Sequence, residues 1–361
     1  MKLKFFLGLA ATERLAVIAL VLLLPQFSPV ALAYPTPERT YEVGLHTITL
    51  DYIDPSGGTQ FVEAAIWYPT DDKASIYTYS DGARSYLAID GELSQTGTAY
   101  PLVIFNHGFN ASEMQSLFLK ETLASEGYIV ASVRFSDNIW GGITEFLSFA
   151  DHQIGDGIDG YLRDVYENYF DTYRLPAAEA LLDYMISESD RAGSLFQGGI
   201  DISAIGMGGH SFGGLTTLGL IGGHSDPAQE DPRIKAALLL SSPSFPFEKN
   251  IGNIDVPIMA MRGDYDLLLN RPEDAFWYLG GEVQPPYYYL VLRNADHFVF
   301  SESDADTGWV PAAIAEDERL KAIDLYALAF FDLYLKGDAS AATTLSQTST
   351  ALLSYDWLTA P

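Results

Sequence analysis

The hydrophobic and polar positions along the chain follow two successive patterns. Apolar-rich stretches at 47–50 and 61–68 flank a turn-forming segment at 54–58, and together they predict a β-hairpin. After Pro101, short and fully apolar runs alternate with stretches of helical periodicity. This second pattern is typical of parallel strands that are covered by helices on both faces, so it predicts an α/β fold with a mostly parallel sheet.

Six strands and five helices are expected in the second part of the chain. The strands are the apolar runs at 102–105, 128–133, 203–207, 236–240, 257–261 and 287–292. The helices are expected at 113–125, 177–187, 213–220, 272–279 and 314–335. The last helix has apolar residues at helical spacing and ends before the sequence Lys-Gly-Asp at 336–338.

Residues 137–175 are too long for an ordinary connection between a strand and a helix. They are rich in aromatic and acidic side chains and predict a helical insertion or lid within one domain at 34–338. The alternative is an amphipathic surface helix whose aromatic side chains pack on the sheet. Residues 339–361 are expected to form a C-terminal tail, and its apolar end at 352–358 could dock as a last short element.

The first 33 residues have the pattern of a cleaved secretory signal. Lys2, Lys4 and Arg14 precede an apolar run at 15–24, and a small-x-small sequence ends at Ala33. Since the run has about half the length that spans a bilayer, we expect cleavage after Ala33 and no stable membrane span in the mature chain. The predicted location is therefore secreted or periplasmic. An uncleaved N-terminal anchor is the alternative.

Composition excludes several classes of chemistry and partner. The 48 acidic and 20 basic side chains give a net charge of −28, which repels nucleic acid, so no nucleic-acid partner is expected. The chain has no cysteine, which excludes disulfides, thiolate metal sites and a cysteine nucleophile. The acidic residues at 151–171 lack the spacing of a calcium loop. We therefore expect no metal site, and the sequence leaves the oligomeric state open.

The motif that carries chemistry is Gly-His-Ser-Phe-Gly-Gly at 209–214, between an expected strand and an expected helix. The letters G-x-S-x-G alone would occur about once in five chains of this composition, so the strand–turn–helix context makes the motif specific. Such a turn lifts the Ser211 hydroxyl above the sheet and places the Phe212 N–H at a helix N-terminus. Ser211 is the candidate nucleophile and Phe212 a candidate oxyanion donor. The alternative is a glycine-rich turn without chemistry.

A serine nucleophile needs a histidine base that a carboxylate orients. His297 lies just after the last expected strand, where the base belongs in the chain order Ser–Asp–His. Asp266, in the loop after the strand at 257–261, is the candidate acid. Asp264 in the same loop is the alternative.

A second oxyanion donor is expected in the loop after the strand at 102–105. Gly108 allows the backbone to turn there, so that the Phe109 N–H points into the site. His107 is expected to support this loop structurally and to take no part in proton transfer.

With these motifs in this order, at 106–109 and 209–214 and with Asp266 and His297, the chain resembles the α/β-hydrolase superfamily. Within it, the chain is similar to secreted bacterial proteins related to platelet-activating-factor acetylhydrolase and to predicted dienelactone hydrolases. The similar part runs from about residue 41 to 338. The resemblance implies an eight-stranded sheet, hydrolysis of carboxylic esters through an acyl-serine intermediate, and no cofactor.

Two departures limit what the resemblance implies about substrate. Dienelactone hydrolases use a cysteine nucleophile, which this chain lacks. Plasma-type acetylhydrolases place the acid after the strand that follows the nucleophile, and here residues 238–243 contain no acid. We therefore expect a secreted serine esterase whose ester, small or lipid-like, is not specified. The aromatic residues at 140–173 would help to form its pocket.

Three alternatives remain open at the level of sequence. A lipase or polyester hydrolase would use the same triad, and a serine peptidase could have the same fold. A non-catalytic binding module could also be built on this scaffold.

Overall fold

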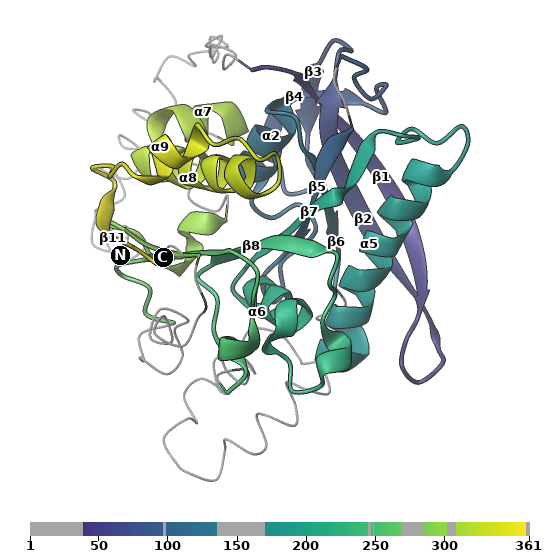
Figure 1. Cartoon of the computed structure of the whole chain (residues 1–361). Helices are drawn as coiled ribbons and strands as arrows, with labels where there is room; N and C mark the ends of the chain where they lie inside the picture. Colours follow the sequence, from purple (N-terminus) through teal and green to yellow (C-terminus); the bar gives the residue numbers. More distant parts are fainter. Residues whose placement is uncertain are drawn as a thin grey trace, which may run out of the picture. The chain divides into compact units, whose positions relative to one another are not determined.

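An eleven-stranded β-sheet lies at the centre of the described part of the chain (Figure 1). The structure is a computed structural model that describes residues 39–96, 99–135, 170–244, 247, 249–268, 284, 286–301 and 308–358. The strands are β1 Glu42–Ile53, β2 Thr59–Thr70, β3 Ser75–Thr78, β4 Arg84–Ile89, β5 Tyr100–Asn106, β6 Ile129–Val133, β7 Ile200–His210, β8 Ile234–Leu240, β9 Ile258–Gly263, β10 Tyr287–Leu292 and β11 Leu352–Leu358. Their order in the sheet is β11-β10-β9-β8-β7-β5-β6-β2-β1-β4-β3.

The eight predicted strands all form, and they are neighbours in the sheet from β10 to β1. β6, β5, β7, β8, β9 and β10 run parallel, and β1 and β2 form the predicted antiparallel hairpin. The expected count of eight strands is wrong, however, because β3, β4 and β11 extend the sheet at its two ends. β3 is short and mostly exposed, so it lacks the apolar run by which the other strands were predicted.

Helices cover both faces of the sheet, as the apolar runs predicted. The helices are α2 Leu117–Ser125, α5 Leu175–Asp190, α6 Phe212–Leu218, α7 Val310–Glu316, α8 Glu318–Tyr334 and α9 Ala341–Leu345. Leu102 and Ile104 of β5 belong to the core with α5 and α6, whereas Val103 and Phe105 pack with α2, α7 and α8. Figure 1 shows α2, α7, α8 and α9 grouped on one side of the strands.

Two predicted helices differ from the observed ones. α2 begins at Leu117 rather than at residue 113, because Ser116 has a left-handed backbone (φ 61°, ψ 43°) that an α-helix cannot continue through. Glu113 lies before this break, and its carboxylate contacts Arg134 at 2.6 and 2.9 Å. The predicted helix at 314–335 is two helices, α7 and α8. Asp317 separates them with a non-helical backbone, and its carboxylate accepts the Arg319 N–H at the start of α8.

Several sequence predictions concern residues outside the described part of the chain. These are the signal at 1–33, the helix at 272–279 and all of the insertion before residue 170, and they stay predictions. No helix among the described residues is long and apolar enough to cross a bilayer.

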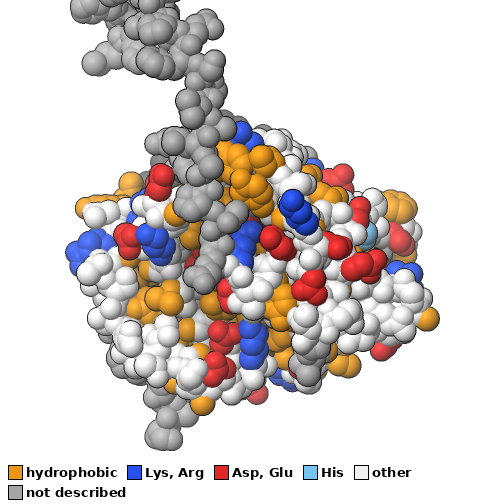
Figure 2. Space-filling view, turned by 90° about the horizontal axis from the view of Figure 1, so that it is seen from above, with side chains coloured by type: hydrophobic (Ala, Val, Ile, Leu, Met, Phe, Trp, Pro, Cys, Tyr) orange, Lys and Arg blue, Asp and Glu red, His pale blue; other side chains and the backbone are white. Residues whose placement is uncertain are grey.

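Acidic and basic groups are interspersed on the face shown in Figure 2. Among the described residues, Arg233 pairs with Asp183 and Asp231, at 2.6 and 2.5 Å. The acidic excess of the chain is therefore not concentrated in one patch on this face.

Candidate active site

Ser211 lies at the junction between β7 and α6 in a strained backbone conformation. Its φ is 54° and its ψ is −120°, a region that costs a residue with a side chain about 1–3 kcal/mol. The Ser211 N–H donates to the Leu240 carbonyl of β8 at 2.8 Å, which holds the turn against the neighbouring strand. The side chain is partly exposed at the end of the sheet. The turn therefore has the sharp strand-to-helix geometry that the motif predicts.

Two glycines allow this turn to pack against β5. A Cβ on residue 213 would lie 1.9 Å from the Asn106 carbonyl oxygen, and a Cβ on residue 209 would lie 2.3 Å from the Gly213 carbonyl carbon. Both clashes involve backbone atoms, which cannot move aside as the end of a long side chain can. The close approach also brings the end of β5 next to Ser211.

His297 and Asp266 are in direct contact at the same edge of the sheet. His297 Nδ1 and Asp266 Oδ2 are 2.9 Å apart, and the side chains are 6% and 0% exposed, respectively. The carboxylate also accepts the Leu268 N–H at 3.1 Å, which fixes its orientation. Asp264, the alternative acid, accepts the Ala295 N–H at 3.0 Å instead. The structure thus brings Asp266 to His297 and gives Asp264 a contact within the loop.

His210 connects the serine turn to the loop that carries His297. The two imidazole rings are 4.8 Å apart, and His210 Nε2 lies 2.9 Å from the His297 carbonyl oxygen. Complete burial, with a smaller contribution from His297, lowers the pKa of His210 to about 3. The ring is therefore neutral near pH 7, and its Nε2–H donates to that carbonyl. Within the described contacts, no hydrogen bond joins Ser211 Oγ to His297.

The loop after β5 is held by hydrogen bonds on both of its sides. His107 Nδ1 lies 2.7 Å from the Gly108 carbonyl oxygen, and His107 Nε2 accepts the Phe135 N–H at 2.9 Å. The Gly108 N–H donates to Gln115 Oε1 at 2.7 Å. The Phe109 ring lies 5.4 Å from the Phe212 ring, so the two candidate oxyanion residues are neighbours. His107 contacts backbone groups on both ring nitrogens, in keeping with a structural role.

The sequence did not indicate two residues that contact the loop after β5. Gln115 contacts Gly108, and the buried Arg174 contacts the carbonyl groups of His107 and Gly108. Nothing in the sequence distinguishes Arg174 from Arg163, which belongs to the same acidic and aromatic stretch. Both contacts depend on chain segments that meet only in the folded protein.

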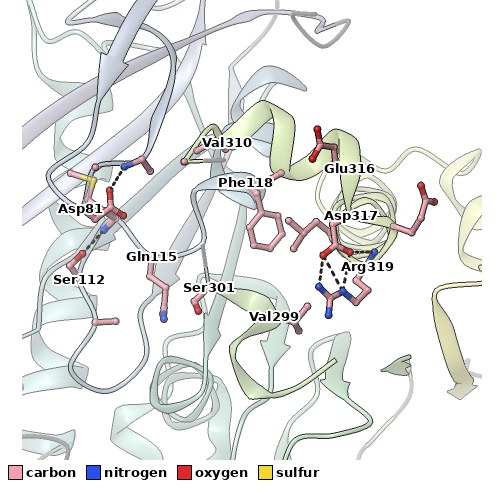
Figure 3. A pocket seen from close by; sticks show the side chains of 18 of the residues that line it. Asp81, Ser112, Gln115, Phe118, Val299, Ser301, Val310, Glu316, Asp317 and Arg319 are labelled. Carbon is pink, nitrogen blue, oxygen red and sulfur yellow. Dashed lines mark hydrogen bonds and ion pairs between the residues drawn. The ribbon is translucent and has the colours of Figure 1, made fainter. Parts of the chain in front are cut away.

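A cavity of about 870 Å³ lies beside this loop (Figure 3). Gln115, Phe118, Val299 and Ser301 line it, and Figure 3 shows Asp317 and Arg319 paired at its other side. Its described lining does not include Ser211, Asp266 or His297.

Among the described residues, no three His, Asp or Glu side chains come together as metal ligands.

A solved structure decides the fold. The ferulic acid esterase from Streptomyces cinnamoneus superposes with a TM-score of 0.59 over 90% of this chain and 98% of its own, at 21% sequence identity. This chain has the α/β-hydrolase fold. The α/β-hydrolase assignment explains why Ser211, Asp266 and His297 each follow the carboxyl end of a parallel strand.

Two family profiles match successive parts of the sequence. The profile of the family described as PET hydrolase-like matches residues 171–323, and that of platelet-activating factor acetylhydrolase, isoform II, matches residues 64–172. The predicted resemblance to α/β-hydrolases and to platelet-activating-factor acetylhydrolases is therefore confirmed.

Three named enzymes align with most of the chain. The cutinase est1 of Thermobifida alba is 24% identical over 67% of this chain and 72% of its own. The platelet-activating factor acetylhydrolase of Cavia porcellus is 23% identical over 78% and 71%. The bis(hydroxyethyl) terephthalate hydrolase of Streptomyces coelicolor is 23% identical over 67% and 69%.

Proposed function

We propose that this protein is a secreted serine hydrolase that cleaves carboxylic esters through an acyl-serine intermediate. The observation that carries the proposal is the buried contact of 2.9 Å between His297 and Asp266, beside the strained turn of Ser211. Such a turn, a histidine and a carboxylate are what a serine nucleophile requires. The pattern of residues 1–33 supports export.

In the proposed mechanism, Ser211 Oγ attacks the acyl carbonyl and His297 Nε2 takes its proton. Asp266 accepts a hydrogen bond from His297 Nδ1–H, which holds the tautomer whose Nε2 is a base. The N–H groups of Phe109 and Phe212 receive the oxyanion. His297 then gives the proton to the leaving alcohol, and water releases the acid by the reverse sequence. The contact between Ser211 and His297 would tighten when substrate binds, as is common in enzymes.

The names of the relatives support ester cleavage over peptide cleavage. A cutinase, a platelet-activating factor acetylhydrolase and a bis(hydroxyethyl) terephthalate hydrolase align with this chain, and the structural neighbour is a ferulic acid esterase. Their differing names leave the acyl and alcohol groups of the substrate unspecified, because pocket shape determines them.

The proposal is tested by labelling the chain from residue 34 onward with a fluorophosphonate while its hydrolysis of p-nitrophenyl butyrate is followed. We expect one label per chain, on Ser211, and loss of hydrolysis in step with labelling. Ser225→Ala is the matched control, because Ser225 also follows a Gly-Gly-His sequence but is exposed and has no preceding strand. Label on another serine, or hydrolysis by fully labelled protein, would contradict the proposal.

A polyester is the second candidate substrate. Tyr265, Leu267 and Phe298 are 61%, 78% and 46% exposed, and they lie on the loops that carry Asp266 and His297. An apolar rim of this kind suits adsorption to a hydrophobic solid. The match to a PET hydrolase-like family supports the same substrate class.

The substrate class is checked by incubating the protein with a polyester film and with a series of p-nitrophenyl esters. If the rim binds polymer, Leu267→Ser is expected to lower release from the film at least about fivefold and to leave p-nitrophenyl acetate hydrolysis nearly unchanged. If the wild-type protein releases no more product from the film than the Ser211→Ala variant does, the polyester is excluded as a substrate. An equal loss on both substrates would assign Leu267 to the pocket of a small-ester enzyme.

A further inference from the structure

We propose that Arg174 is a positioning residue that aims the Phe109 N–H at the developing oxyanion. The inference rests on the proposed function, because it concerns the same site. Arg174 lies just before α5, far along the chain from the loop after β5, and its side chain is completely buried. No substrate atom needs to contact it, since it would act through the backbone of that loop.

The guanidinium of Arg174 contacts two successive carbonyl groups of the loop. Nη1 lies 2.9 Å from the His107 carbonyl oxygen, and Nη2 lies 3.3 Å from the Gly108 carbonyl oxygen. A planar guanidinium can reach both acceptors at once, which a single ammonium group cannot do with the same geometry. The loop is thereby fixed at the two residues that precede Phe109.

The Gly108 carbonyl matters because it shares a peptide unit with the Phe109 N–H. In a planar trans peptide, the C=O and the N–H point in opposite directions. Arg174 and His107 both donate to this carbonyl, at 3.3 and 2.7 Å, so the direction of the N–H is set as well. Hydrogen bonds to the carbonyl also polarise the peptide, which makes its N–H a stronger donor.

Arg174 also contacts the helix that carries the other candidate donor. Its Nη1 lies 3.4 Å from Thr216 Oγ1, and the Thr216 hydroxyl donates to the Phe212 carbonyl at 2.9 Å. One guanidinium therefore links the loop of Phe109 to the first turn of α6. This link fixes the separation of the two N–H groups that would bind the oxyanion.

Aromatic rings hold the guanidinium in place. Its central carbon lies 4.4 Å from the Phe135 ring centre and 5.9 Å from those of Phe170 and Phe212. Stacking on aromatic faces suits arginine, whose charge is delocalised and weakly hydrated. An arginine at this position also brings a positive charge, which a neutral hydrogen-bond donor would not. In the proposed mechanism this charge lies near the site where the oxyanion forms.

The inference is tested with Arg174→Met and Arg174→Lys by steady-state kinetics and by hydrogen exchange of the amides at 107–109. Loss of one oxyanion donor typically lowers the rate by about 10²–10³-fold. In Arg174→Met the Phe109 N–H is still present but its direction is no longer fixed, so we expect kcat to fall by about 10–100-fold. We expect KM to change less than about threefold. Arg174→Lys keeps the charge and one carbonyl contact, and we expect it to recover part of the loss. Exchange of the Phe109 amide should become at least about tenfold faster in Arg174→Met.

Leu181→Ala is the matched control. Leu181 is fully buried on α5, so its truncation removes core volume, and a leucine side chain forms no hydrogen bond with the carbonyl groups of the loop. It is expected to lower the melting temperature without a selective increase of exchange at 107–109. Unchanged loop exchange in a folded Arg174 variant, or equal effects in Leu181→Ala, would overturn the inference. If Arg174→Met does not fold, Arg174→Lys decides by the same two readouts. Failure of the proposed function is seen separately, as absence of labelling and ester turnover in the wild type.

Discussion

Replacing Ser211 by alanine is expected to lower kcat for p-nitrophenyl esters by about 10⁵–10⁶-fold. Without the hydroxyl no acyl-enzyme forms, and His297 has no nucleophile from which to take a proton. Knocking out the nucleophile of a serine hydrolase triad typically costs this much, and what remains comes from the oxyanion donors and from substrate binding. The measurement is kcat and the burst of p-nitrophenol at high enzyme concentration, which should disappear in the variant.

The Ser211→Ala variant is expected to fold, which makes the kinetic result decisive. The Ser211 backbone keeps its hydrogen bond to Leu240, and the side chain forms no hydrogen bond among the described contacts that the substitution would break. Its melting temperature should therefore lie close to that of the wild type. Residual kcat within tenfold of the wild type, in a folded variant, would rule out Ser211 as the nucleophile.

The strands that bear the site could be predicted because their sequences are limited by burial. β5 is buried at every position, and a strand that helices cover on both faces admits only apolar side chains for most of its length. β3 and β11 form at the two ends of the sheet, where no such restriction acts. The sequence gives no sign of β3, and for residues 352–358 it predicts only a short docking element, which the structure shows to be β11, paired with β10. Their pairing depends on neighbours that the local sequence does not identify.

Two helix boundaries depend on single residues that the apolar spacing does not reveal. The apolar spacing of residues 314–335 continues across Asp317, so periodicity predicts one helix. The break occurs because the Asp317 carboxylate caps the following turn by accepting the Arg319 N–H. The start of α2 is displaced from residue 113 to Leu117 because Ser116 has a left-handed backbone, which the apolar spacing does not indicate.

In the site, too, residues that follow a predicted strand could be identified from the sequence, whereas a residue that depends on tertiary contacts could not. Ser211, Asp266 and His297 could be proposed from sequence because each follows a strand, and the carboxyl ends of parallel strands meet at one edge of the sheet. Arg174 follows no strand, and its contacts with His107 and Gly108 arise only because α5 packs beside β5. A positioning residue of this kind has no motif, so it could be found only from the folded structure.

The two carboxylates of the loop after β9 offer the sharpest remaining comparison, because they are close in sequence and differ in what they contact. Asp266 contacts His297 Nδ1 at 2.9 Å, whereas Asp264 accepts the Ala295 N–H at 3.0 Å. A carboxylate can only accept, so Asp266 requires the proton on Nδ1 and leaves Nε2 as a base. An asparagine amide can donate to Nδ1 instead, which would favour the tautomer that cannot take the serine proton.

Asp266→Asn is therefore expected to lower kcat for p-nitrophenyl butyrate by about 10⁴-fold near pH 7, with little change in structure. Asp264→Asn is expected to change kcat less than about threefold, because the asparagine carbonyl oxygen can still accept the Ala295 N–H. Both substitutions remove one negative charge from the same loop, so a general electrostatic effect would lower both rates alike. A large loss in Asp264→Asn with activity retained in Asp266→Asn would reverse the assignment. Loss in Asp266→Asn alone would show that the orientation of His297, and not the charge of the loop, is what the acid provides.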